Sequence, residues 1–440
     1  MITRGGRNGA MSDVVDLCRD LIRIDSTNTG DLATSAGERK AAEYVAGVLS
    51  SVGLEPAVLE TAAGRTNLVT RIPGRDPSRG ALLVHGHLDV VPADASEWSV
   101  HPFSGEIKDG YVWGRGAVDM KDFDAMVLAT VKKWHAEGVT PDRDIVLAFT
   151  ADEEAGGDYG AHFLVREHAD LFDGCTEAIG EVGGFSVTVA QDLRLYLIQT
   201  AEKGIDWLRL HASGRPGHGS FVNDDNAVTT LTEAVARLGR HKFPVVVTPT
   251  VRSFLEQASE VLGVELDPND PETAIAKLGP ISRIIGATIR NTANPTRLAA
   301  GYKDNVIPSR ASATIDCRTL PGYAEEFQEQ LRAVVGDHIE IETVHHQSAL
   351  ETTFDGALVD AMAAALRAED AGARPVPYML SGGTDAKAFA TLGMRCFGFS
   401  PLKLPADLNF AALFHGIDER VPTEGLEFGV RVLDRLLRTC

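Results

Sequence analysis

The spacing of apolar residues in the first half of the chain predicts alternating helices and strands. Apolar positions recur at helical intervals in VVDLCRDLIRI and in RKAAEYVAGVLSSVG, where Gly53 is well placed to end the second helix. β-Rich runs follow at TNLVTRIPG and ALLVHGHLDVV, then a helical stretch over 120–138 and the apolar strand of DIVLAFTADEE. Strands that are apolar throughout and alternate with helices predict an α/β fold, in which helices cover a sheet.

The pattern changes near Glu202, where apolar and polar residues alternate in IDWLRLHASG and ATIDCRTLPG on either side of a helical segment over 225–241. Alternation predicts strands with one exposed face. We therefore expect an inserted α+β domain over 204–317, which interrupts a first domain formed by 11–203 and 318–440. Within the insert, the turn-rich DPNDPETAIAKLGP is expected to be a surface loop with a short helix. Residues 1–10 are expected to be a disordered extension, because no apolar segment follows that would make them a secretory signal.

Length and composition narrow the class of protein. A chain of 440 residues exceeds the usual size of one hydrophobic core, which agrees with two domains. Its 44% hydrophobic and 24% charged residues are typical of soluble globular proteins, and no apolar run approaches the roughly 20 residues of a membrane span. The net charge of −20 argues against nucleic acid or an anionic membrane as a partner, since both are bound through excess Lys and Arg.

Five widely separated cysteines without a CxxC pair indicate a reducing compartment, and we expect a cytoplasmic protein. They also imply that any metal here is bound by His and carboxylates.

Polar segments follow three of the predicted strands. They are 85–89 after ALLV, 151–154 after IVLAFT and 181–184 after EAIG. Ligands of open α/β sheets bind at the carboxyl ends of strands, so these segments are candidates for a site. His87 and Asp89 are two residues apart and would project from one face of a strand, where the carboxylate could support the imidazole. A polar pair satisfied by local hydrogen bonds would give the same pattern.

The other candidates are weak when taken singly. Taken alone, Asp119 in GRGAVDMKDF is better explained as a helix N-cap, and the adjacent Glu153 and Glu154 are better explained as part of a solvated loop. Glu181 and His415 are uninformative by themselves. Together, however, two histidines, several carboxylates and no cysteine make a nitrogen and oxygen donor set suited to a pair of divalent metals. Of two adjacent carboxylates, one can bind metal while its neighbour moves a proton.

A series of motifs in fixed order resembles the M20 family of metallopeptidases and amidohydrolases: HGHLDVVP, GRGAVDMKD, ADEEAGG, IGEVGG, GRPGHGS, DNVIPSRASATIDCRTLPG, SGGTDAKAF and FHGIDERVP. That family includes aminoacylases, glutamate carboxypeptidases, dipeptidases, acetylornithine deacetylase and succinyl-diaminopimelate desuccinylase. The resemblance spans about residues 12–440. It implies a zinc-peptidase-like catalytic domain, with a central mixed sheet flanked by helices, and an inserted α+β lid and dimerisation domain.

The resemblance also implies roles for individual residues. His87 and Glu181 would bind one zinc, Glu154 and His415 the other, and Asp119 would bridge the two ions. Asp89 would support His87, and Glu153 would be the general base.

Substrate contacts are implied in the same way. His218 would reach the active site of the partner subunit, and Asn305 and Arg318 would hold the substrate. An arginine suits a carboxylate because its planar fork pairs with both oxygens. Backbone N–H groups around Gly382, Gly383 and Thr384 could receive the same carboxylate. Without the resemblance, the stretch around His218 would be interpreted as a glycine-rich turn, and SGGTD would be interpreted as an ordinary loop.

The expected function is therefore hydrolysis of an amide bond in an N-acyl amino acid, a dipeptide or a peptide C-terminus. Two divalent ions would be required, zinc foremost and cobalt or manganese as alternatives, in a homodimer formed through the lid. A biosynthetic deacylase, such as a desuccinylase, and a non-catalytic binding protein of the same fold are the alternatives. The lid is longer between Pro244 and Gly286 than a compact lid requires.

Overall fold

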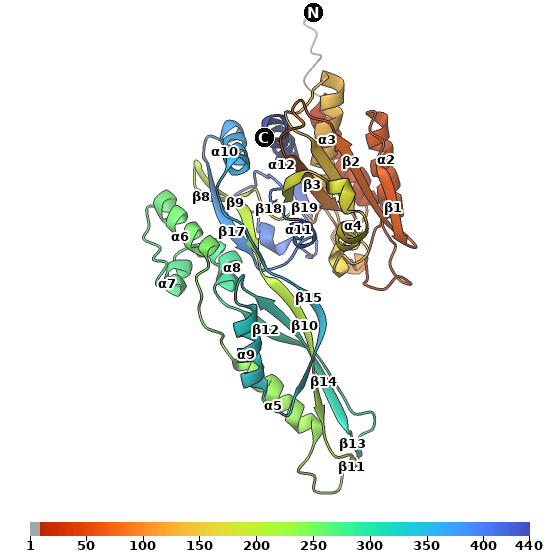
Figure 1. The fold of residues 1–440 in the computed structure, drawn as a ribbon, viewed down its shortest axis with the longest axis vertical. Coiled ribbons are helices and arrows are strands. Elements are labelled where there is room, and N and C mark those ends of the chain that lie inside the picture. The colour runs from red at the N-terminus through yellow and green to blue at the C-terminus, as the bar shows by residue number, and fades with distance from the viewer. Residues whose placement is uncertain (1–8) are drawn as a thin grey trace, which may run out of the picture. The chain divides into compact units, whose positions relative to one another are not determined.

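The computed structural model describes residues 9–440, which form two compact units (Figure 1). The first unit contains the chain up to Thr200 together with Thr352–Pro377 and Thr384–Cys440, and the second contains Ala201–Glu351 and Tyr378–Gly383. Of the extension expected over 1–10, residues 1–8 lie outside the described part, and helix α1 already begins at Gly9.

The first unit is built on a mixed sheet. Its strands follow the order β1-β2-β6-β3-β7-β18-β9, and β8 and β17 also pair with β9. β3 runs parallel to both β6 and β7, whereas β1 and β2, and β2 and β6, are antiparallel. The central mixed sheet is therefore confirmed. Its strands are β1 (Ala57–Ala62), β2 (Arg65–Ile72), β3 (Ala81–His87), β6 (Ile145–Thr150), β7 (Cys175–Gly180), β8 (Phe185–Ala190), β9 (Leu193–Glu202), β17 (Ala373–Leu380) and β18 (Arg395–Gly398).

Helices cover both faces of this sheet. A Cβ atom added at Gly86 of β3 would lie 2.3 Å from Asp124 Oδ1 on α3, so that face meets α3. Because successive residues of a strand point to opposite faces, His85 points the other way, and its ring centroid lies 4.9 Å from that of Phe389 on α11. The helices are α1 (Gly9–Arg23), α2 (Arg39–Ser51), α3 (Lys121–Glu137), α4 (Ala161–Glu167), α10 (Ala357–Glu369), α11 (Ala386–Ala390) and α12 (Thr423–Thr439). A small separate sheet joins β4 (Glu106–Lys108), β5 (Tyr111–Trp113) and β19 (Arg420–Pro422).

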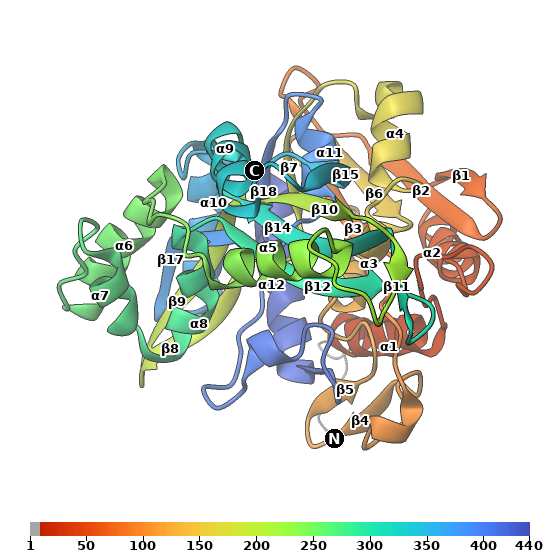
Figure 2. The same cartoon turned by 90° about the horizontal axis from the view of Figure 1, so that it is seen from below.

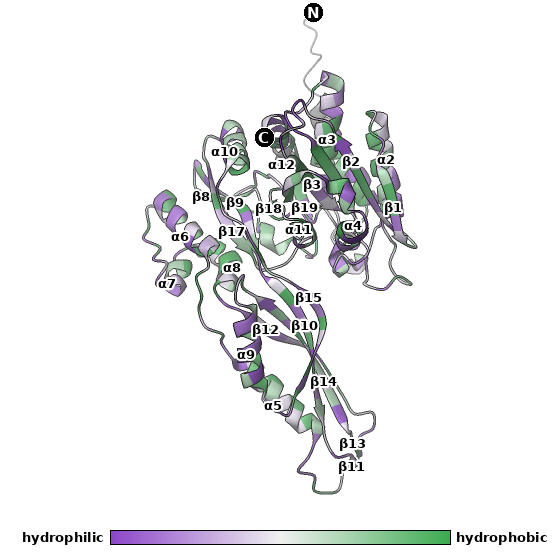
Figure 3. Cartoon of the chain, in the orientation of Figure 1, coloured by the Kyte–Doolittle hydropathy of each residue, from purple (hydrophilic) through white to green (hydrophobic). Residues whose placement is uncertain are grey.

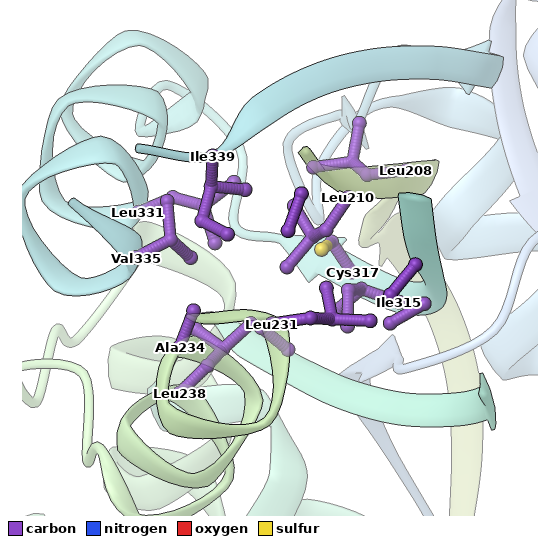
Figure 4. Close-up of a cluster of buried hydrophobic side chains, with 14 of the residues drawn as sticks. Leu208, Leu210, Leu231, Ala234, Leu238, Ile315, Cys317, Leu331, Val335 and Ile339 are labelled. Carbon is purple, nitrogen blue, oxygen red and sulfur yellow. The ribbon is translucent and has the colours of Figure 1, made fainter. Parts of the chain in front are cut away.

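The second unit contains a four-stranded antiparallel sheet in the order β12-β14-β10-β15. Its strands are β12 (Thr292–Ala300), β14 (Arg310–Thr319), β10 (Gly204–Ser213) and β15 (Glu340–Gln347). Buried and partly exposed residues alternate along β10 and β14, as the sequence predicts. Helix α5 (Ala227–Arg240) lies along the strands of this sheet (Figure 2) and, with α9 (Ala324–Val335), closes the apolar core drawn in Figure 4. Both helices show purple and green stretches in Figure 3, as expected of helices with one buried face.

The second unit extends beyond the boundary expected at residue 317. Helix α9 contributes Phe327, Leu331 and Val335 to the core under the sheet, and β15 pairs along β10. Residues 318–351, expected in the first domain, therefore belong to the second unit, because the helix and the edge strand that complete its sheet come after Arg318.

Further short elements complete the second unit. Its sequence between Pro244 and Gly286 forms α6 (Pro249–Leu262), α7 (Pro271–Ala276) and α8 (Ser282–Ile285), and α7 is the short helix expected in DPNDPETAIAKLGP. The strand pairs of this unit also include β11 (Gly217–His218) with β13 (Val306–Ile307), while β16 (Leu350–Glu351) pairs with the end of β9. Across residues 9–440, every helix is too short or too polar to cross a membrane.

Candidate metal centre

Three neighbouring parallel strands deliver most of the candidate ligands. His87 is the last residue of β3, Glu153 and Glu154 lie in a short 3₁₀ turn after β6, and Glu181 directly follows β7. Because β6, β3 and β7 are adjacent and parallel, their carboxyl ends lie at one edge of the sheet. The two remaining candidates, Asp119 and His415, come from loops before α3 and β19.

These side chains converge on two groups of donors that share His87. One group is His87, Asp119 and Glu154, and the other is His87, Glu153 and Glu181; within each group the ligand atoms lie within 4.8 Å of one another. Asp119 turns one oxygen to each histidine: Oδ1 is 3.1 Å from His87 Nε2, and Oδ2 is 3.2 Å from His415 Nε2. His415 Nε2 is also 3.0 Å from Glu154 Oε2, and His87 Nε2 is 3.5 Å from Glu181 Oε2. Asp119 therefore links the two histidines, with one oxygen facing each of them.

The electrostatics of the cluster favour bound cations. Burial raises the pKa of Glu181 to about 8, and burial together with the charge of Glu181 raises the pKa of Glu153 well above its usual range. Hydrogen bonds to Asp119 and Glu154 raise the pKa of His415 to about 10. Glu154 Oε1 is buried without a hydrogen-bond partner among the described residues. Crowded buried carboxylates are unfavourable unless protons or cations compensate them, and the nitrogen and oxygen donors present suit divalent metals such as zinc.

Asp119 is not a helix cap. The cap position of α3 is Met120, and its side chain makes no capping hydrogen bond. The loop that carries Asp119 is instead tied to the loop that carries His415. Arg115 Nη1 is 2.6 Å from Glu419 Oε2, and Glu419 Oε1 accepts a 2.7 Å hydrogen bond from the Val118 N–H. Arg115 and Glu419 both lie inside the quoted motifs, but nothing in the sequence near either residue indicates this pairing.

With this geometry established, comparison with known proteins decides the family. The model of peptidase family M20/M25/M40 matches residues 83–439. The chain belongs to the M20 peptidase family. It is accordingly a hydrolase that acts on amide bonds, in a metal-dependent family.

Individual relatives cover most of the chain. The N-fatty-acyl-amino acid synthase/hydrolase PM20D1 of Xenopus tropicalis is 27% identical, over 97% of this chain and 85% of its own. Aminoacylase-1 of Sus scrofa is 28% identical, over 88% of this chain and 86% of its own. Among solved structures, the M20 family metallo-carboxypeptidase Sso-CP2 of Sulfolobus solfataricus has the same fold, with a TM-score of 0.74, 17% identity and coverage of 97% of this chain and 98% of its own.

Asp89 of this M20 chain organises the turn that carries the acidic pair. Its Oδ1 accepts from the Glu153 N–H and its Oδ2 from the Glu154 N–H, each at 3.1 Å. His87 Nδ1 lies 3.0 Å from the backbone carbonyl of Asp89 and 3.6 Å from its carboxylate. The carbonyl is thus the nearer partner of the imidazole, while the carboxylate fixes the Glu153–Glu154 turn.

A buried polar network contacts Asp89 through Asn28. Asn28 Nδ2 lies 2.8 Å from Asp89 Oδ2 and 3.1 Å from Asp152 Oδ1. Arg65 Nη2 donates to Asn28 Oδ1 at 2.7 Å, and its Nη1 pairs with Glu38. All five side chains are buried. No local pattern indicates this network, because its members come from segments far apart in the chain.

Two further buried groups lie on the α11 side of the sheet. Asp385 accepts a 2.6 Å hydrogen bond from Thr150 Oγ1, and burial raises its pKa to about 7. Asp385 lies within the SGGTDAKAF motif, and that motif is the sequence feature that could have identified it. His85 is packed against Phe389, and burial lowers its pKa to about 3, which makes it a neutral core histidine.

The substrate-contact residues expected from the motifs divide between the two units. His218, Asn305, Arg318, Gly382 and Gly383 belong to the second unit and Thr384 to the first. The second unit brings His218 and Asn305 together, because the Gly219 N–H donates to the Asn305 carbonyl at 2.9 Å. The Ser220 N–H donates to His218 Nδ1 at 3.2 Å, which leaves Nε2 to carry the proton of a neutral ring. Arg318 pairs with Asp316, and Thr384 Oγ1 accepts from the Ala386 N–H at 3.1 Å.

Proposed function

We propose that this protein is a two-metal amidohydrolase that cleaves the amide bond of a substrate with a free carboxylate, such as an N-acyl amino acid or the C-terminal residue of a peptide. The observation that carries the proposal is the position of Asp119, whose two oxygens face His87 and His415. His87, Asp119 and Glu181 would hold one ion, and His415, Asp119 and Glu154 the other. Zinc suits these donors best, with cobalt or manganese as substitutes.

Ions at this site would polarise the scissile carbonyl and lower the pKa of water. Glu153 is the residue best placed to move the proton. Its Oε2 lies 4.0 Å from His87 Nε2, and its backbone is fixed by Asp89. Glu153 would take the proton from the attacking water and return it to the leaving amine.

The second unit, together with Thr384 of the first, would supply the remaining groups. Arg318 and Asn305, with the backbone N–H groups at Gly382, Gly383 and Thr384, would bind the substrate carboxylate. His218 Nε2–H would donate to the developing oxyanion, from the partner subunit of a homodimer joined through the lid. The names of the relatives, an aminoacylase and an N-fatty-acyl-amino acid synthase/hydrolase, support acyl amino acids as substrates. We also propose a cytoplasmic location, which the five free cysteines support.

Hydrolysis by metal-depleted and reconstituted protein tests the proposal. A panel of N-acetyl and N-succinyl amino acids and dipeptides is offered after chelation and after addition of zinc, cobalt or manganese. We expect activity to vanish on chelation and to return with a divalent ion, with two ions bound per chain by elemental analysis. Full activity in the chelated protein, or no hydrolysis of any substrate after reconstitution, would contradict the proposal.

A further inference from the structure

Arg318 is held at one edge of its guanidinium group and is open at the other. Its Nε and Nη2 donate to the two oxygens of Asp316 at 2.6 and 3.1 Å. The side chains of Arg318 and Asp316 are 24% and 31% exposed, so the pair lies at the surface of the second unit. The remaining nitrogen of the guanidinium group, Nη1, has no hydrogen-bond partner among the described residues. That end can pair with both oxygens of a second carboxylate.

The strand register places an aromatic side chain next to this pair. Trp207 on β10 lies opposite Asp316 on β14 and opposite His345 on β15. Residues directly opposite one another in a sheet project from the same face, and diagonal neighbours such as Trp207 and Arg318 are roughly 7–8 Å apart. The rings of Trp207 and His345 pack with centroids 4.9 Å apart.

This face of the sheet is not the one that α5 and α9 cover. The neighbours of Trp207 and Arg318 in the strands, Leu208 and Cys317, point the other way, into the core closed by these helices. Trp207 and Arg318 are both partly exposed. An indole with an open side, beside an arginine with a free carboxylate-binding edge, matches an amino acid with a large apolar side chain.

We propose that Trp207, backed by His345, is a specificity-determining residue that receives the amino-acid side chain of a substrate whose carboxylate is bound by Arg318. The inference rests on the proposed function, which assigns the carboxylate to Arg318. The enzyme then selects aromatic and large aliphatic residues in the carboxylate-bearing half of its substrate. Asp316 is the positioning residue, since it orients Arg318, and its charge next to Trp207 disfavours acidic side chains.

The test compares N-acetyl derivatives of L-phenylalanine, L-leucine, L-alanine and L-aspartate as substrates of the zinc-loaded enzyme. We expect the first two to have the highest kcat/KM and the aspartate derivative the lowest. Trp207→Ala is expected to lower kcat/KM for the phenylalanine and leucine derivatives about tenfold, while the alanine derivative changes no more than about threefold. Trp207→Phe is expected to restore most of the preference, which separates a lost contact from a damaged fold.

Leu298→Ala is the matched control, because Leu298 is an apolar residue of the same sheet, 61% exposed, and pairs in register with Ala313, away from Arg318. It is expected to leave all four values unchanged. Arg318→Met is expected to reduce kcat/KM for every substrate that has a carboxylate. If the wild-type enzyme hydrolyses these substrates and Trp207→Ala lowers all four equally or none of them, the inference about Trp207 is overturned while the proposed function stands.

Binding provides a readout that does not need turnover. L-Phenylalanine is titrated into wild-type and Trp207→Phe protein, and the difference in tryptophan fluorescence reports on Trp207 alone. A saturable change that L-alanine does not reproduce supports the inference. Identical titrations of the two proteins contradict it.

Discussion

The metal-ligand cluster of the first unit and the substrate-contact residues of the second unit are held in opposite ways. His87, Asp119 and Glu181 are buried, and within each of the two donor groups the ligand atoms lie within 4.8 Å of one another. His218 and Asn305 are exposed, and what fixes them is a short strand pair and a turn.

The contrast decides how far each assignment can be argued from geometry. Several carboxylates buried together are costly without compensating cations, so the cluster is itself evidence for metal binding. Exposed polar side chains carry no desolvation penalty, so the roles proposed for the residues of the second unit are drawn from motif resemblance.

The largest effect is expected at the residue that both proposed ions share. Asp119→Ala removes a donor from each ion, so we expect loss of bound metal and a fall of hydrolysis to background. Elemental analysis and kcat measure the two effects. Asp16→Ala, at an exposed aspartate that pairs with Arg19, is the control. An Asp119→Ala enzyme with both ions and normal activity would remove the bridging role.

Glu153 tests whether the cluster separates metal binding from proton transfer. Glu153→Gln keeps the size of the side chain but cannot accept the proton, so kcat is expected to fall roughly 10²–10⁴-fold while metal content is unchanged. The exposed Glu167 provides a matched control in Glu167→Gln. Normal turnover by Glu153→Gln would assign the base to another residue.

His218 tests the exposed side of the comparison. His218→Ala is expected to lower kcat about 10²–10³-fold through loss of the oxyanion donor, without a change in metal content or thermal stability. Mixing inactive Glu153→Gln and His218→Ala chains under conditions of subunit exchange is expected to regenerate activity. If exchange occurs and no activity returns, His218 acts within its own chain or has no catalytic role.

Asn28 tests whether the buried network positions the acidic turn. Asn28→Ala leaves Asp89 and Asp152 without their amide donor, and kcat is expected to fall about 10–100-fold, as is typical for groups that orient metal-site residues. Stability is expected to fall by about 1–3 kcal/mol from the unpaired buried oxygens. Asn223→Ala, at a partly exposed asparagine that donates to the Arg215 carbonyl, is the control. Unchanged kinetics would reduce the network to a purely structural role.

The smallest expected effect is a pH dependence of the metal-free protein. Burial raises the pKa of Glu181 from 4.5 to about 8, so the folded metal-free chain binds more protons than the unfolded chain within that window. The contribution of Glu181 to stability is therefore complete below about pH 4.5 and is lost as the pH rises towards about 8. Urea unfolding across this range measures it. Added zinc is expected to flatten the dependence, since metal replaces the proton, and a flat profile without metal would contradict the argument.

Much of the first unit could be predicted from local pattern. The apolar runs before His87, Glu153 and Glu181 became the adjacent strands β3, β6 and β7, and residue types alone indicated a metal site without cysteine. The end of the second unit could not be predicted in this way. That α9 and β15 belong to it depends on which sheet they join, and their own sequences do not encode this choice.

The sequence by itself determined the elements and the candidate ligands, because helical and strand periodicity is a property of neighbouring residues. Tertiary structure alone decided that the Asp119 oxygens face two different histidines, that Asp89 binds the Glu153–Glu154 turn, and that Asn28 and Arg65 stand behind it. These contacts join residues that are tens to hundreds of positions apart. They exist because the order and register of the strands bring distant loops to one edge of the sheet, and nothing in the sequence near any one of these residues specifies that order.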